Sequence, residues 1–379
     1  LQGMSLPIIP LAISVLRSAL PTERVGPAMG LISSSLGVGG ALGLPVSAVI
    51  AQKADWHMLF WSAGVLGVMA LLLFGFLVPD VPASSADKFD PLGTLLLAVG
   101  LVTLLLPISK GSTWGWTSTT TLSLFLVSLA VFAVFARWQF RTPTPIVDLR
   151  TTLRRPVLTT NIAAILVCFA MFAFGLVAPQ ALELPTGTGY GLGQSMVQAG
   201  LWLAPGGLAM MLASPLAARV APRRGPKFTL VCGSAIIAVA YLGAVWLLGS
   251  PPAVMVVNIV ISMGVGFAYS SLPALINAAV PVSETAAANG INALARSLGT
   301  SISSAVIGVV LATMTITYGG HTMPSLNGLR AALLIAAAVA ALAAVIAMTI
   351  PRTDESDEST LSDWAAEEAE LAGDPLIRG

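Results

Sequence analysis

The sequence predicts an all-α polytopic membrane protein, with lipid rather than water around most of its surface. Three observations predict this fold class: a mean hydropathy of +0.89, a charged fraction of 9%, and apolar runs long enough to cross a bilayer. Soluble domains carry roughly 25% charged residues, so this composition leaves too little polar surface for a water-soluble protein. Disordered, collagen-like, disulfide-stapled and nucleic-acid-binding proteins are excluded by the same composition.

Eleven apolar runs of about 17–25 residues, bounded by Pro, Gly or charged residues, predict eleven transmembrane helices. Their length and continuity favour helices over barrel strands, which would appear as short segments of alternating polarity. In chain order, the predicted helices cover residues 1–16, 26–50, 58–78, 91–108, 121–136, 157–182, 194–218, 228–249, 254–279, 287–314 and 329–350.

The charges in the loops predict the orientation, because Lys and Arg accumulate on the cytoplasmic side. One set of alternate loops, with the C-terminal tail, holds fourteen of the 18 basic residues. The other set holds Lys53, Lys110 and Arg330, while Arg296 lies inside a predicted helix. We therefore expect a multi-pass protein of the plasma (inner) membrane, with Leu1 on the outer face and a cytoplasmic C-terminus. Nine of the 17 acidic residues lie in 352–379, which predicts an acidic, disordered tail.

A shift of 260 residues aligns two segments of the chain: Pro21 with Pro281, Ala28 with Ala288, Gly30 with Gly290 and Gly39 with Gly299. Transporters are commonly built from such repeats. If the first three predicted helices match the last three, three helices are missing from the front. We then expect a fragment of a fourteen-helix protein, a reading that the absent initiator Met also favours. The expected parts are 1–79 (remainder of the N-terminal half), 80–156 (an inserted helix pair), 157–350 (the C-terminal half) and 351–379 (the tail).

The predicted helix 26–50 carries a glycine motif. Gly39 and Gly43 are four residues apart and share one helical face, where small residues let another backbone approach closely. A general helix-packing seam would have the same property. Pro45 removes a hydrogen bond and bends the helix. The full pattern is Gly30, eight residues, Gly39, three residues, Gly43, then Pro45, Ser47 and Ala48.

This pattern resembles the antiporter motif of the major facilitator superfamily, and within it of the fourteen-span drug:proton antiporters. Pro45 comes one residue late, and Ser47 and Ala48 replace two glycines. The resemblance implies the major facilitator fold and proton-driven export of an amphipathic compound by alternating access. Further segments that resemble the family in order along the chain are 55–60, 89–93, 110–116 and 289–299.

A few charged residues are candidates for gating or coupling. Glu183, at the outer end of its predicted helix, either loads and releases a proton or is a solvated rim residue. Arg296 either has a gating or cavity role or snorkels to cytoplasmic carbonyls and Glu284. The loop with Arg219, Arg223 and Gly225 resembles a second family motif; it either braces the inward gate or only anchors the chain.

Polar and aromatic residues inside the predicted helices are candidates to line a substrate cavity, with interhelical packing as the alternative for each. They are Gln180, Trp202, Asn258, Tyr269, Asn277 and Asn292.

No cluster of catalytic or metal-ligating side chains is apparent, since His57 and His321 lie far apart without a nearby partner. We therefore expect no enzyme activity, no metal and no cofactor, with the proton gradient as the driving force. The expected partners are the lipid bilayer and a small amphipathic substrate. We expect no nucleic-acid partner and a monomeric protein. Two alternatives stay open: an exporter of an endogenous lipid or secondary metabolite, and an inactive truncated remnant.

Overall fold

The computed structural model describes residues 12, 15–16, 22–55, 57–77, 90–142, 145–147, 149–280 and 284–351, and most of them are helical. The elements are α2 (Thr22–Lys53), α3 (His57–Leu77), α4 (Pro91–Trp114), α5 (Thr119–Gln139), α6 (Leu149–Thr152), α7 (Arg155–Glu183), a 3₁₀ turn (Thr186–Thr188), α8 (Met196–Arg224), α9 (Pro226–Leu247), α10 (Pro251–Ala279), α11 (Thr285–Thr313), β1 (Thr315–Tyr318), β2 (His321–Pro324) and α12 (Leu326–Met348).

The predicted helices from 26–50 onward are all present, and their ends differ from the prediction by at most six residues. Nine of the described helices are long and apolar enough to cross a membrane, and α2 adds the shorter apolar stretch Ala41–Lys53. The chain is thus an integral, multi-pass membrane protein. The predicted helix 1–16 and the acidic tail lie almost entirely outside the described residues.

Local sequence explains where the long helices begin. The side chains of Asp90, Ser118, Ser195 and Ser325 each accept a hydrogen bond from a backbone N–H in the first turn of the helix that follows. Such caps satisfy donors that have no partner inside the helix. Helices α7, α9 and α10 instead begin with proline in the first turn, where the missing N–H has no cost.

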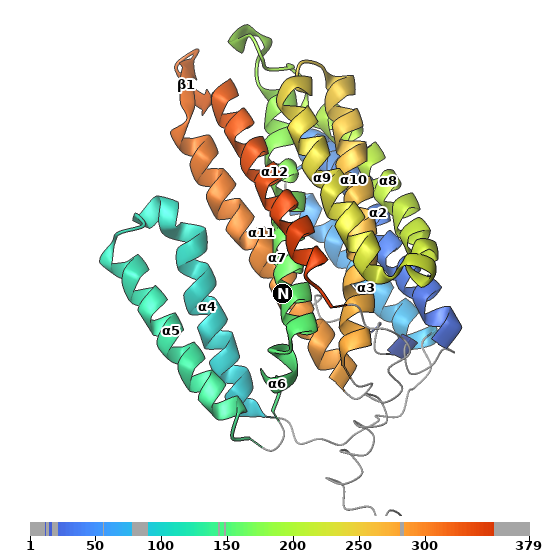
Figure 1. The fold of residues 1–379 in the computed structure, drawn as a ribbon. Helices are drawn as coiled ribbons and strands as arrows, with labels where there is room; N and C mark the ends of the chain where they lie inside the picture. The colour runs from blue at the N-terminus through green and yellow to red at the C-terminus, as the bar shows by residue number, and fades with distance from the viewer. Residues whose placement is uncertain are drawn as a thin grey trace, which may run out of the picture.

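Helices α7 to α12 form the main bundle (Figure 1). Within it, α9 packs against α10 and α12, and α7 packs against α11, α12 and α10. The largest group of buried apolar side chains comes from these helices. Helix α2 lies against α8 and α10, so it joins the bundle from the side opposite the α4–α5 hairpin.

The α4–α5 hairpin stands beside α11 and carries a buried carboxylate at its base. Asp90 is 5% exposed, and its carboxylate accepts hydrogen bonds from Gly93 N (2.8 Å), Trp138 Nε1 (3.1 Å) and Gln139 Nε2 (3.1 Å). Burial raises the pKa of Asp90, but these hydrogen bonds outweigh it and leave the pKa below its ordinary value of 3.8. Gln139 Oε1 also accepts from Val147 N (3.3 Å), which ties the hairpin to the segment before α7.

One element departs from the all-α prediction: β1 and β2 form an antiparallel hairpin at the end of the molecule that is predicted to be outer. Its tip is Gly319–Gly320, both with positive φ (59° and 80°). Two such glycines after a run of β-branched and aromatic residues are a hairpin signal, which the long apolar helices on either side obscure. The Tyr190 hydroxyl donates to Pro324 O and so joins the hairpin to the α7–α8 connection.

Candidate functional site

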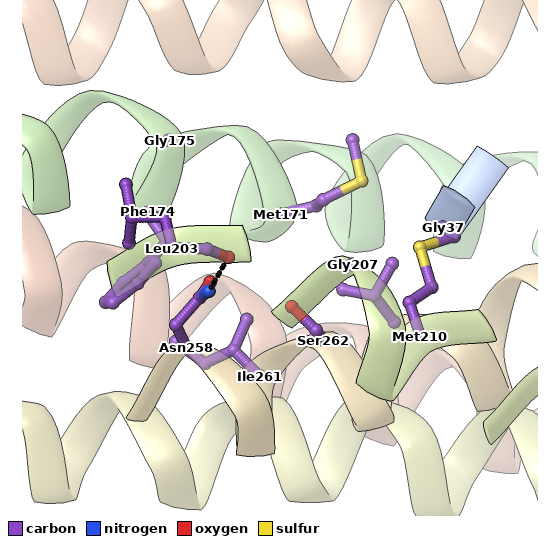
Figure 2. Close-up of a pocket in the computed structure, with 11 residues that line it drawn as sticks. Gly37, Met171, Phe174, Gly175, Leu203, Gly207, Met210, Asn258, Ile261 and Ser262 are labelled. Atoms are coloured by element: carbon purple, nitrogen blue, oxygen red, sulfur yellow. Dashed lines mark hydrogen bonds between the residues drawn. The ribbon is translucent and has the colours of Figure 1, made fainter. Parts of the chain in front are cut away.

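A cavity of about 220 Å³ lies between α2, α7, α8 and α10, near the middle of these helices. Its described walls are mainly apolar, and among the described lining residues only Asn258 and Ser262 contribute polar side chains (Figure 2). The lining residues are Gly37, Met171, Phe174, Gly175, Leu203, Gly207, Met210, Asn258, Ile261, Ser262 and Val265.

Two glycines bring α2 to the cavity. A Cβ added at Gly37 would lie 2.7 Å from both Gly207 O and Met211 N of α8, and a Cβ at Gly207 would overlap the backbone of Ala41. Real Cβ atoms do not approach backbone atoms this closely, so both positions require glycine. The two backbones therefore touch where α2 crosses α8, as expected of small residues at membrane helix interfaces.

The motif glycines themselves face elsewhere. Gly39 and Gly43 are exposed, and no described residue lies within 4 Å of a Cβ added at either. The close backbone approach occurs at Gly37, a glycine that the sequence analysis did not single out. Helix α2 runs unbroken across Pro45, and the surroundings of Gly30 lie outside the described residues.

Asn258 is the predicted cavity residue that the structure places in the cavity. Its amide also donates to Leu203 O on α8 (2.7 Å), as Figure 2 shows. A Cβ at Gly206 would overlap this amide, so α8 and α10 are in close contact at the cavity wall. Asn258 thus combines the two roles left open for it, lining the cavity and linking two helices.

A second pocket, of about 320 Å³, lies toward the predicted outer end and brings Glu183 and Ser47 together. Both side chains are exposed. They come from α7 and α2, which are far apart in sequence, so spacing along the chain gave no sign of this pairing. Leu203 lines both this outer pocket and the central cavity, and it is only 7% exposed. The two pockets therefore share the Leu203 side chain as a common wall residue.

Two other predicted cavity residues form amide pairs instead. Asn292 Nδ2 donates to Asn161 Oδ1 (2.9 Å), which links α11 to α7. Asn289 Nδ2 donates to Asn277 Oδ1 (2.7 Å), which links α11 to α10. Neither Asn277 nor Asn292 lines either of the two pockets, so their described role is to hold three helices together.

Trp202 and Gln180 also lie outside the lining of both pockets. Trp202 Nε1 donates to Gln194 Oε1 (3.1 Å) in the segment before α8. Gln180 lies on α7 next to Pro179, a residue of the outer pocket. The most useful cavity residues that sequence reasoning missed are Met171 and Met210, because an apolar side chain in an apolar helix carries no distinguishing signal.

Arg296 and Tyr269 lie together, and Tyr269 is one turn further along α10 than the cavity residue Val265. The Arg296 guanidinium carbon is 5.3 Å from the centre of the Tyr269 ring, a cation–π distance. The Tyr269 hydroxyl lies 3.2 Å from Cys168 Sγ on α7. The three side chains thus connect α7, α10 and α11.

The basic loop between α8 and α9 is organised around Gly225, whose φ of +81° allows the sharp turn. Arg219 and Arg223, predicted to lie in this loop, belong instead to the last turns of α8 and are exposed. Arg224, the last residue of α8, stacks on Phe228 with 5.2 Å from its guanidinium carbon to the ring centre. Lys227 Nζ donates to Ile350 O, just past the end of α12. The loop therefore fastens α9 to α12 within the main bundle. Its gating role stays a prediction.

Comparisons with known proteins agree with this architecture. The sequence model of the Major Facilitator Superfamily matches residues 1–304. Among curated relatives, the MFS-type transporter YcnB of Bacillus subtilis is 24% identical over 93% of this chain and 74% of its own length. The multidrug resistance protein B homolog of Mycobacterium tuberculosis is 29% identical over 61% of this chain and 42% of its own length.

The lincomycin resistance protein LmrB of Listeria monocytogenes is 25% identical over 68% of this chain and 54% of its own length. The match therefore spans only about half of the two resistance proteins. Among solved structures, the nucleoside transporter NupG aligns with 92% of this chain and 89% of its own, at 16% identity and a TM-score of 0.42. Since the family model matches most of the sequence, the chain belongs to the Major Facilitator Superfamily, a family of membrane transporters rather than enzymes.

Proposed function

We propose that the chain acts in a proton-coupled exporter of amphipathic small molecules, of the fourteen-span drug:proton antiporter type, which works by alternating access. The observation that carries the proposal is the central cavity, where α2 meets α7, α8 and α10. Helix α2 belongs to the first copy of the sequence repeat, and the other three helices belong to the C-terminal half. Transporters of this kind place their substrate sites between repeats.

The cavity lining suits an amphipathic ligand. Met171, Phe174 and Met210 offer apolar surface, and Asn258 and Ser262 offer polar groups. Ligand sites usually have about 300–1,000 Å³ and a mostly apolar wall with few polar groups. The central cavity, of about 220 Å³, is smaller than this by itself, and the adjoining outer pocket adds about 320 Å³. Relatives named as multidrug and lincomycin resistance proteins support small-molecule export.

Glu183 is the best-placed residue for proton coupling. Its carboxylate lies at the outer pocket, opposite Ser47 of α2, and no described residue forms a hydrogen bond or ion pair with it. In the proposed cycle, Glu183 takes up a proton from the outer side and carries it inward when α2 and α7 change their separation.

The test uses full-length protein, as its gene encodes it, in proteoliposomes with an imposed pH gradient. A panel of neutral and charged fluorescent amphipathic dyes reports transport, and pyranine inside the vesicles reports proton flux. We expect gradient-dependent dye transport, and a loss of coupled proton flux of about 100-fold in Glu183→Gln, the scale of removing a proton-transfer group. Asp55→Asn is the matched control, because Asp55 lies at the same end, pairs with His57 (2.8 Å) and lines neither pocket. Dye transport that ignores the gradient removes the antiport proposal.

A further inference from the structure

Arg296 carries a charge that its described surroundings do not neutralise. Its Nε is buried and has no hydrogen-bond partner. Among described residues, no carboxylate lies within 4.0 Å of its guanidinium, and the Tyr269 ring is the group that meets it. An aromatic face attracts a cation, but it accepts no N–H···O bond from the guanidinium edge.

The position of Arg296 makes this unusual. It is eleven residues into α11, a helix of 29 residues, which places it about 16 Å from the start of the helix at 1.5 Å per residue. A guanidinium stays charged at every relevant pH, so burial cannot neutralise it. Ionisable groups at such depth in a membrane protein face the bundle interior or a cavity and meet a partner there.

The central cavity lies one helical turn away. Tyr269 follows Val265 by four residues on α10, and Cys168 precedes Met171 by three residues on α7. Val265 and Met171 both line the cavity. Because residues three or four apart share one face of a helix, the Arg296–Tyr269–Cys168 group lies on the same faces of α7 and α10 as the cavity wall. Tyr269 and Cys168 therefore lie one turn beyond the cavity wall, and the Arg296 guanidinium rests against the Tyr269 ring.

We propose that Arg296 binds the carboxylate of an amphipathic acid whose apolar part occupies the central cavity. The planar guanidinium fork matches a carboxylate with two parallel hydrogen bonds, and one monoanion balances the one fixed charge. The wall formed by Met171, Phe174 and Met210 holds the apolar part. The inference rests on the proposed transport function and names its substrate class, organic acids with an apolar tail.

The test measures binding, without a gradient, to full-length protein in phosphatidylcholine nanodiscs. The probes are 12-(dansylamino)dodecanoic acid and its methyl ester, which differ in charge at one end only. We expect the acid to bind at least about tenfold more tightly than the ester, and Arg296→Gln to remove that difference, since truncating one partner of a buried charge pair costs tenfold or more. Arg296→Lys should restore part of it, because it keeps the charge and loses the fork.

Arg224→Gln is the control, since Arg224 also stacks on an aromatic ring, but it is exposed at the C-terminal end of α8. It should leave the binding of both probes unchanged. Unchanged ester binding in Arg296→Gln shows that the variant is folded. Equal affinity of the wild type for acid and ester, or equal loss of both in Arg296→Gln, overturns the proposal. Because no gradient is applied, these results are independent of whether transport is proton-coupled.

Discussion

At the scale of single residues, Asn258 shows how a polar side chain in a membrane helix serves two purposes. Its amide lines the cavity and binds Leu203 O at 2.7 Å. Interhelical hydrogen bonds in membranes contribute about 0.6 kcal/mol on average and at most about 1.7. Asn258→Leu should therefore lower the free energy of unfolding by about 1 kcal/mol, measured by chemical unfolding in detergent micelles. Ser262→Ala, in the same wall one turn away, should change it by less than half as much; a larger effect from Ser262→Ala would contradict this assignment.

Asp90 gives a pH-dependent prediction. Its folded pKa lies below 3.8, its ordinary and unfolded value, because bonds from Gly93, Trp138 and Gln139 outweigh its desolvation. The carboxylate therefore contributes stability that is fully present above the unfolded pKa and is lost as the pH falls through the folded pKa. Wild type should exceed Asp90→Asn in unfolding free energy by about 1.5–3 kcal/mol at pH 7, the range for hydrogen bonds to a charged group.

The two proteins should converge as the pH falls below about 4 and through the folded pKa of Asp90, measured by thermal unfolding in detergent. The control is Asp55→Asn, which removes an exposed carboxylate and should change the unfolding free energy at pH 7 by less than Asp90→Asn does. A gap between wild type and Asp90→Asn that does not narrow as the pH falls below about 4 would show that packing rather than charge is responsible.

At the scale of elements, the length of the apolar runs and the residues that begin each helix predict the helices well. The Asp90–Pro91 and Ser195–Gln198 pairs act as helix starts within three residues of the predicted bounds. Which face of a helix meets a neighbour was not predictable in the same way. The repeat pairs Gly39 with Gly299, yet a Cβ at Gly299 would overlap Ile165 O of α7, while Gly39 meets no described residue. The same residue type at matching positions thus has different neighbours, because packing partners are set by the tertiary arrangement.

The crossing of α2 and α8 separates these cases experimentally. Gly37→Leu places a side chain where Gly207 O and Met211 N already lie 2.7 Å from a Cβ, whereas Gly43→Leu enters open space in the described part of the molecule. Overpacking costs typically about 1–3 kcal/mol or more. Gly37→Leu should therefore lower the unfolding temperature and the yield of folded protein, measured by fluorescence-detected size exclusion, and Gly43→Leu should change neither. Equal effects of the two substitutions would mean that the helix face with Gly39 and Gly43 is also packed against a neighbour.

At the scale of the whole molecule, sequence reasoning predicted the long helices of the described residues, but it could not say which of their polar side chains line a pocket. Asn258 lines the central cavity, and Glu183 and Ser47 share the outer pocket. Asn277 and Asn292, which are equally polar, pair with amides on neighbouring helices instead. A polar residue in an apolar helix must find a partner, but only the fold decides whether that partner is another helix or a cavity.

Because Leu203 lines both pockets, we predict that its side chain separates them. Asn258 holds the backbone of Leu203. Leu203→Ala removes most of the partition and should join the central cavity to the outer pocket. The test introduces one cysteine by Ser262→Cys in a protein whose Cys168 and Cys232 are replaced by Ala. The rate at which a membrane-impermeant maleimide, added from outside, labels this cysteine measures access to the central cavity. We expect Leu203→Ala to make labelling at least about tenfold faster, because the reagent no longer has to wait for a rarely populated open conformation. Leu208→Ala, an exposed leucine of α8 that lines neither pocket, should leave the rate unchanged. A rate that Leu203→Ala does not raise would place the outer barrier at another residue and leave Leu203 as packing alone.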